Sequence, residues 1–139
     1  MIWRALSLKQ KINDGGERIN YGEQMAIREP AVGKGAYYLV SPFPYDRLAK
    51  WYEMGAAKYT NKETGVSGAR NWEKGMPFSR FADSAERHFN KWKMGMEDED
   101  HLIAAIWNLW AIAHFEELGR TDLDDMPHYL REPSDVKKG

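Results

Sequence analysis

The chain has 139 residues, of which 42% are apolar and 29% charged, and it contains no cysteine. A chain of this length can bury a core without cross-links, and the lack of cysteine excludes disulfides and thiolate metal sites. The longest apolar run, residues 102–115, is shorter than the roughly 20 residues that a membrane span needs. Because the first residues do not resemble a secretory signal either, we expect a cytoplasmic protein with one domain, residues 1–139.

Charge is distributed unevenly although the net charge is only −1. Residues 1–96 carry sixteen bases and ten acids, whereas residues 97–125 carry nine acids and one base. A basic region beside an acidic one could bind a polyanion together with a divalent cation, but two solvated surfaces attracting each other explain the pattern as well. No basic run exceeds two residues, so we do not expect a nucleic-acid partner.

Residues 1–40 are predicted to form a glycine-rich, partly extended N-terminal arm. Five of its glycines fall within 21 residues, too many for a continuous helix. The aromatic and β-branched run 36–40 predicts a short strand. Arg28 and Lys34, the latter between two glycines, resemble a loose anion-binding nest without the spacing of a P-loop.

Residues 41–127 are predicted to form a small, mainly α helical core. Apolar residues at three- and four-residue steps predict helices at about 45–59 and 78–95, and a largely apolar segment predicts a central helix at about 99–118. The polar residues 60–70, with two glycines, predict a mobile loop. We expect residues 128–139 to be a loose tail.

Four consecutive acids stand at the start of the predicted central helix, among them Glu99 and Asp100, and His101 follows them. The positive end of a helix dipole accounts for one or two such acids. Four neighbouring carboxylates repel one another unless a cation lies among them. Carboxylates without soft ligands suit Mg²⁺ or Mn²⁺, the ions that serve phosphate substrates, and we therefore predict a metal site here.

His101 and Asn108 are seven residues apart and so share one face of the central helix. Buried polar groups need partners, so the two could form a satisfied pair in the core. The small residues around them, such as Ala104 and Ala105, leave room for a closely packed helix or for a ligand.

Two further pairs have both a structural and a functional interpretation. Asp83 and Arg87 have the i, i+4 spacing of an ordinary salt bridge, which we favour on spacing alone, although Arg87 could also bind phosphate. Trp72 could belong to the core or stack on a nucleobase, with the neighbouring Asn71 contacting the base edge.

Taken in order, these motifs resemble the phage and bacterial dATP/dGTP diphosphohydrolase family, which is related to the all-α, MazG-type nucleoside triphosphate pyrophosphohydrolases. The resemblance covers about residues 20–127. It is carried by the segments Gly33–Gly35, Gly55–Tyr59, Asn71–Pro77, Asp83–His88, Asp98–Leu102, Ala104–Ala105, Trp107–Asn108 and Leu123–Pro127.

The resemblance implies metal-dependent hydrolysis of a purine deoxynucleoside triphosphate to the monophosphate and pyrophosphate. It implies that Glu99 and Asp100 are metal ligands, with Asp83 as a further candidate. The residues implied to neutralise or bind phosphate are Arg87, Lys58, Lys34 and Arg28. The residues implied to orient water or ligand are His88, His101 and Asn108. Asn71 and Trp72 would face the base.

The MazG-type enzymes carry a Glu-x-x-Glu motif that this chain lacks, Asp83-x-x-Glu86 being the nearest match. A catalytically silent protein of the same fold, which binds or sequesters a nucleotide, is therefore the alternative to an enzyme. Six Trp and seven Tyr are many aromatics for one small core, and aromatics are enriched at interfaces. We therefore also expect a homo-oligomer, either a dimer or a tetramer.

Overall fold

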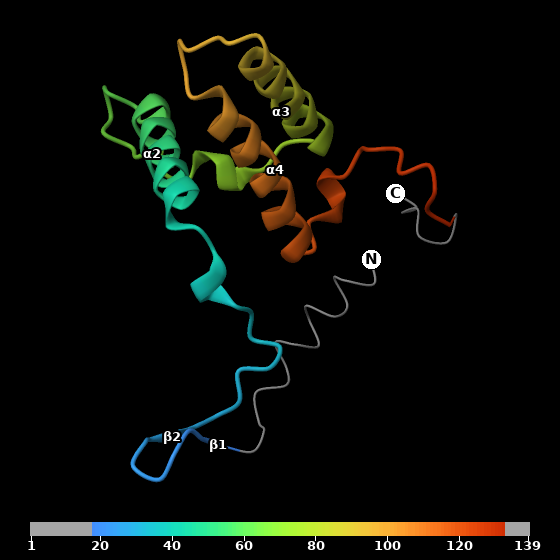
Figure 1. The fold of residues 1–139 in the computed structure, drawn as a ribbon. Helices are drawn as coiled ribbons and strands as arrows, with labels where there is room; N and C mark the ends of the chain where they lie inside the picture. Colours follow the sequence, from blue (N-terminus) through green and yellow to red (C-terminus); the bar gives the residue numbers. More distant parts are fainter. Residues whose placement is uncertain (1–17, 133–139) are drawn as a thin grey trace. The chain divides into compact units, whose positions relative to one another are not determined.

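The computed structural model describes residues 18–132, which are mainly α, as expected (Figure 1). They contain three α-helices and one two-stranded sheet. The chain divides into two compact units between Pro42 and Phe43, and each unit is described by itself below. The rest of the expected arm, residues 1–17, and of the expected tail, residues 133–139, lies outside the described residues.

The first unit contains a short hairpin. Strands β1 (Ile19–Asn20) and β2 (Ile27–Arg28) are antiparallel, with Ile19 opposite Arg28. The side chain of Asn20 accepts a hydrogen bond from the backbone N–H of Gly22 (2.9 Å) and so stabilises the turn that follows β1. This hairpin confirms that the arm is partly extended.

The strand predicted at residues 36–40 is wrong, because this segment forms a single 3₁₀ turn, η1 (Tyr37–Leu39). Backbone hydrogen bonds run from Leu39 to Ala36 (3.0 Å) and from Val40 to Tyr37 (3.1 Å). The side chains of residues 37–40 are all largely exposed. Aromatic and β-branched residues favour strands by packing on a half-buried sheet, and no such sheet covers them among the described residues.

The three predicted helices are α2 (Pro42–Tyr59), α3 (Phe78–Lys93) and α4 (His101–Glu117), and all but the first residue of α2 belong to the second unit. Their ends agree with the predicted ends within three residues. Both α3 and α4 stop just before a glycine with a positive φ, Gly95 (82°) and Gly119 (71°). In each case the next residue donates a backbone hydrogen bond five residues back, which closes the helix end. No helix within residues 18–132 is both long and apolar enough to cross a membrane.

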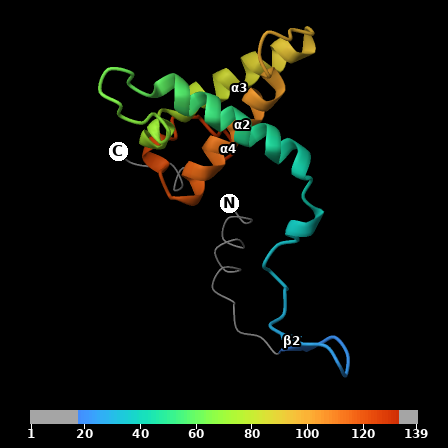
Figure 2. The ribbon, with the colours of Figure 1, turned by 90° about the vertical axis from the view of Figure 1, so that its left-hand side faces the viewer.

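The core forms where α3 and α4 pack side by side, as Figure 2 shows. Phe78 and Phe81 of α3 contact Ala111 and Phe115 of α4, and all four side chains are buried. Four partly buried side chains extend this cluster: Trp72, Trp107, Ile112 and Leu123.

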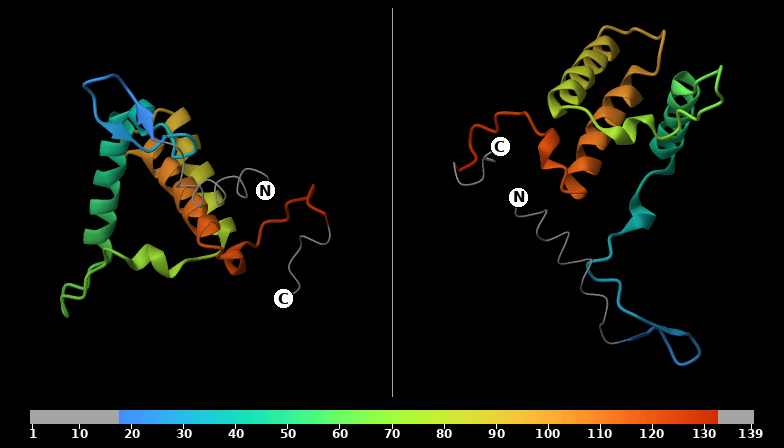
Figure 3. Two further views of the ribbon diagram at one scale, coloured as in Figure 1. Left: turned by 90° about the horizontal axis from the view of Figure 1, so that it is seen from below. Right: turned by 180° about the vertical axis from the view of Figure 1, so that it is seen from behind.

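The segment between α2 and α3 folds back on the end of α2. The backbone N–H of Gly68 donates to the hydroxyl of Thr60 (2.9 Å), and a Cβ at Gly68 would lie 2.2 Å from the carbonyl carbon of Tyr59. The side chain of Asn61 accepts two further backbone hydrogen bonds within the loop. These hydrogen bonds define the conformation of the loop, whose mobility stays a prediction. The short helix η2 (Asn71–Lys74) then leads to the start of α3 (Figure 3).

Asp125 ties the segment after α4 to the first turn of α3. That segment begins with η3 (Thr121–Leu123). The Asp125 carboxylate accepts hydrogen bonds from the backbone N–H (2.8 Å) and the hydroxyl (2.5 Å) of Ser79. The residue before α3, Pro77, makes no side-chain cap. Asp125 therefore supplies from a distance the acceptor that a local capping residue usually provides.

We expect Asp125→Ala to lower the melting temperature by a few degrees, since it removes two hydrogen bonds that join α3 to the end of the fold. Thermal unfolding followed by circular dichroism measures the change. Glu53→Ala, which removes an exposed acid from α2, is the matched control and should leave the melting temperature unchanged. Equal melting temperatures for the two variants would contradict the role of Asp125.

The stabilisation by Asp125 should also depend on pH. The Ser79 hydroxyl, and then its backbone N–H, hold the pKa of the Asp125 carboxyl below its usual range. A carboxyl whose pKa is lowered by folding stabilises the protein above its unfolded pKa of about 3.9 and loses this effect as the pH falls through the folded pKa. The difference in melting temperature between wild type and Asp125→Ala should therefore shrink below about pH 4.

Candidate functional site

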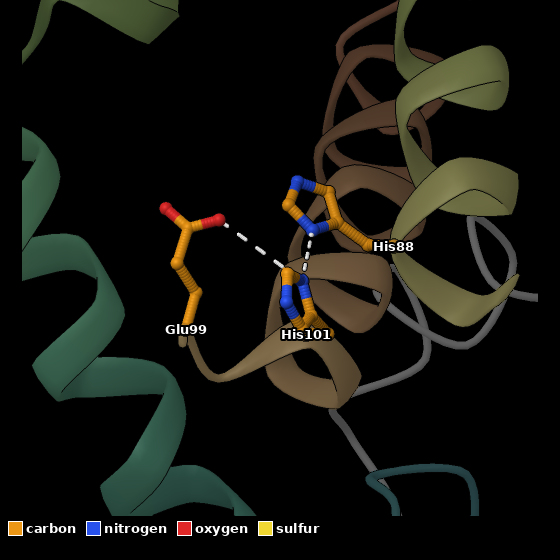
Figure 4. A group of neighbouring side chains, drawn as sticks. All are labelled: His88, Glu99 and His101. Carbon is orange, nitrogen blue, oxygen red and sulfur yellow. Dashed lines mark hydrogen bonds and ion pairs between the residues drawn. The ribbon is translucent and has the colours of Figure 1, made fainter. Parts of the chain in front are cut away.

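Three side chains converge at one end of the α3–α4 pair (Figure 4). His88 comes from α3, His101 is the first residue of α4, and Glu99 lies in the turn between them. The His88 and His101 Nδ1 atoms are 3.0 Å apart, and a Glu99 carboxylate oxygen lies 4.0 Å from His101 Nδ1. One ligand atom from each residue lies within 4.8 Å of the others, so the group could hold a metal ion.

The tautomer of His101 follows from its partners. Its side chain is completely buried, and its Nε2 lies 2.7 Å from a carboxylate oxygen of Asp98. Because an ionised carboxylate only accepts hydrogen bonds, Nε2 carries the proton when the ring has a single one. The lone pair is then on Nδ1, which faces His88 and Glu99. This hydrogen bond from His101 is also the main reason why the pKa of Asp98 is lowered.

His88 also has the protonation state that a metal ligand needs. Partial burial lowers its pKa, and the nearby negative charge of Glu99 opposes this shift only in part. His88 is therefore neutral at pH 7, the form in which imidazole binds metals.

The close approach of α3 and α4 brings the two histidines together. Ala85 of α3 and Ala104 of α4 are buried, and such small side chains let two helices approach closely. The chain reverses direction between the helices, so His88, near the end of α3, meets His101, at the start of α4.

Asp100 has a different environment from Glu99. Its carboxylate accepts two hydrogen bonds from Arg47 of α2 (3.0 and 2.5 Å) and one from the backbone N–H of Ile103, which caps α4. The hydrogen bond from Arg47 is the main cause of the lowered pKa of Asp100, and Asp100 in turn raises the pKa of Arg47. The structure thus places Asp100 between α2 and α4 rather than with the histidines and Glu99.

A pocket of about 620 Å³ opens beside the histidines, lined by α2, the following loop and η2, α3 and α4. Part of its lining is aromatic. Tyr52, Trp72 and Trp107 meet edge to face, with ring centroids 5.7–6.3 Å apart. Four cationic side chains also line it: Lys58, Arg80, Arg87 and Lys91. One anionic side chain, Glu99, is among the lining residues.

Asn108 lies on the α4 side of this pocket and is 5% exposed. Its amide nitrogen donates to the backbone carbonyl of Ala104 (2.8 Å). Because a carbonyl only accepts, this contact fixes which end of the amide is nitrogen. Asn108 therefore has a satisfied hydrogen-bond donor in the helix and also borders the pocket. It agrees in part with a polar core residue and in part with a ligand-contacting residue.

The pocket brings together most of the residues predicted from the sequence. Seven of them line it: Lys58, Asn71, Trp72, Arg87, His88, Glu99 and Asn108. His101 is buried next to His88. Asp83 forms the expected salt bridge with Arg87, is exposed, and does not line the pocket. Arg28 and Lys34 belong to the other unit.

Sequence reasoning did not select several residues of the site. Trp51, Tyr52 and Trp107 line the pocket although their helical spacing is typical of core residues. Arg80 and Lys91 resemble solvated charges of a surface helix. Asp98 carries a usable signal, since it lies three residues before His101.

The comparisons with known proteins identify the family. A family model described as dATP/dGTP diphosphohydrolase, N-terminal, matches residues 26–126. The chain belongs to this family. The matched segment contains the His88–Glu99–His101 group and every residue that lines the pocket. The family name indicates a hydrolase. Searches of curated proteins and of solved structures returned no match.

We expect Asp100→Ala to destabilise the metal-free protein by about 1–2 kcal/mol, because it removes a helix cap and the partner of Arg47. Arg47→Ala removes only the partly exposed ion pair and should cost less than about 1 kcal/mol. Urea denaturation measures both changes. An unchanged stability of Asp100→Ala would show that the acid contributes nothing to the fold.

Proposed function

We propose that this protein hydrolyses purine deoxynucleoside triphosphates, such as dATP and dGTP, to the monophosphate and pyrophosphate, with a divalent ion held by His88, Glu99 and His101. The observation that carries the proposal is the position of this metal-binding group at one end of a pocket that is both cationic and aromatic. A nucleotide needs all three features, because it combines a flat base with several negative phosphates.

The layout of the pocket supports one orientation of the nucleotide. His101 and Asn108 are seven residues apart on α4, which corresponds to about 10.5 Å along the helix. Arg87 and Lys91 flank His88 in sequence and lie near the metal-binding group, where they would neutralise phosphates. Tyr52, Trp72 and Trp107 also line the pocket with their rings in contact, and a base would stack or pack against them.

In the reaction, a water oxygen bonds to the α-phosphorus and the water gives up a proton to the solvent. The bond from that phosphorus to the α–β bridging oxygen breaks, and pyrophosphate leaves with the electron pair. A bound divalent ion would supply the charge that polarises the phosphate oxygens and lowers the pKa of the attacking water. Arg87 binds negative charge on the leaving pyrophosphate, and Asn71 and Asn108 contact the nucleoside.

The ligand set also bears on the identity of the metal. Two imidazoles and one carboxylate suit a first-row transition ion better than Mg²⁺, which prefers oxygen ligands. Of the two ions predicted from the sequence, we therefore propose Mn²⁺. Isothermal titration should show tighter binding of Mn²⁺ than of Mg²⁺ to the wild type, and His88→Ala should remove this preference.

The central test is Glu99→Gln in a pyrophosphate-release assay with dATP or dGTP and Mn²⁺. Removing a hydrogen-bond partner of a metal ligand typically lowers activity by up to roughly 100-fold. Because Glu99→Gln removes a ligand itself, it should lower turnover by more than this. Glu97→Gln, which removes the same charge two residues earlier, should keep the wild-type rate. Tight nucleotide binding by the wild type without product would instead support the silent nucleotide-binding alternative. Equal rates for both variants would exclude Glu99 from the site.

We further propose that the chain forms a homo-oligomer through the outer face of α4. Leu109 and Trp110 are 58% and 51% exposed, and Ile106 and Ala113 lie beside them on the same helix. An apolar stripe at this spacing can pack against the same stripe of a second copy.

Light scattering should give a mass of at least twice 16.1 kDa for the wild type. Leu109→Glu should yield monomers, because it places a charge in the centre of the stripe. Val66→Glu changes an exposed apolar residue in the loop after α2 and should leave the mass unchanged. A monomeric wild type would exclude this assembly.

A further inference from the structure

Asp98 contacts the candidate metal-binding group without belonging to it. Its carboxylate oxygen lies 2.7 Å from Nε2 of His101, while its own side chain is 62% exposed. His101, by contrast, has no exposed side-chain surface. The buried ring therefore has Asp98 on the side of Nε2. His88 and Glu99 lie on the side of Nδ1.

The two tautomers of His101 differ in their ability to bind a metal. With the proton on Nε2, the Nδ1 lone pair points to the space shared with His88 and Glu99. With the proton on Nδ1, an N–H group occupies that direction and the ring cannot act as a ligand there. The hydrogen bond to Asp98 favours the first tautomer, because a carboxylate accepts and cannot donate.

We propose that Asp98 is a positioning residue, whose hydrogen bond to Nε2 holds His101 in the tautomer and orientation that direct its Nδ1 lone pair at the metal. This inference rests on the proposed function, since it assigns Asp98 to the same metal site. A carboxylate in this position also makes the imidazole a stronger base, and removing such partners typically weakens metal binding 10- to 100-fold.

The first experiment needs no metal. Nitrogen-15 NMR of the imidazole rings reports which ring nitrogen of His101 carries the proton. The metal-free wild type should show the proton on Nε2, and Asp98→Ala should show a mixture of tautomers. Asp98→Glu, which keeps a carboxylate, should restore the wild-type pattern at least in part. An identical His101 tautomer in wild type and Asp98→Ala would overturn the proposal.

The second experiment measures Mn²⁺ affinity by isothermal titration. Asp98→Ala should bind Mn²⁺ roughly 10- to 100-fold more weakly than the wild type, and Asp98→Glu should recover part of the loss. Glu97→Ala is the matched control, because it removes an equal charge from the neighbouring exposed position, and it should bind as the wild type does. A simple effect of surface charge would weaken Asp98→Ala and Glu97→Ala equally and would overturn the proposal.

These outcomes separate the positioning role from the proposed function. If the wild type binds no Mn²⁺, the metal site itself fails, and the role of Asp98 fails with it. If the wild type binds Mn²⁺ and releases pyrophosphate while Asp98→Ala binds as tightly, only the role of Asp98 is overturned. Far-ultraviolet circular dichroism of each variant verifies that α4 is intact.

Discussion

The packing of α3 against α4 is the constraint on which the rest of the second unit depends. Buried aromatic rings, Phe81 and Phe115 among them, hold one part of the pair together, while Ala85 and Ala104 allow the helices to approach closely. The connection between the helices, residues 94–100, reverses the chain, and His88 then lies against His101. The same contact that buries the core thus also fixes the spacing of the candidate metal ligands.

The site contains few protein charges that would compete with a ligand. The Nε2 of His101 has Asp98 as its acceptor, its Nδ1 faces His88 and Glu99, and the pKa of His88 is lowered by burial. The candidate ligand set contains two imidazoles and one carboxylate, and the cations around the pocket leave it suited to an anion. A metal ion and a phosphate chain would neutralise these groups together.

The run of four acids, residues 97–100, divides into separate tasks in the structure. Asp98 faces His101 from outside, Glu99 lies with the histidines, and Asp100 caps α4 and pairs with Arg47. Asp98 and Asp100 therefore have different hydrogen-bond donors, and Glu99 lies 4.0 Å from Nδ1 of His101. This division reduces the mutual repulsion that the sequence alone suggests, because His101 donates a hydrogen bond to Asp98 and Arg47 donates to Asp100.

The sequence predicted the helices of the second unit well, because their signals are local. Apolar periodicity, prolines near the starts and glycines after the ends depend on residues within a few positions of each other. It also predicted the Asp83–Arg87 salt bridge, which lies within one helix. The prediction failed for residues 36–40, because a strand there would need a partner strand, and the described residues provide none.

Only the tertiary structure decided which residues form the site. Arg47 and Asp100 are 53 residues apart, and Ser79 and Asp125 are 46 apart, so no local pattern indicates either pair. The sequence and the family resemblance named Glu99 and Asp100 as metal ligands, with Asp83 as a further candidate, and gave His88 and His101 the role of orienting water or ligand. Residue types and spacing determine which side chains are able to bind a metal. The angle and the distance between the packed helices decide which of these side chains point to a common space. The core sets both.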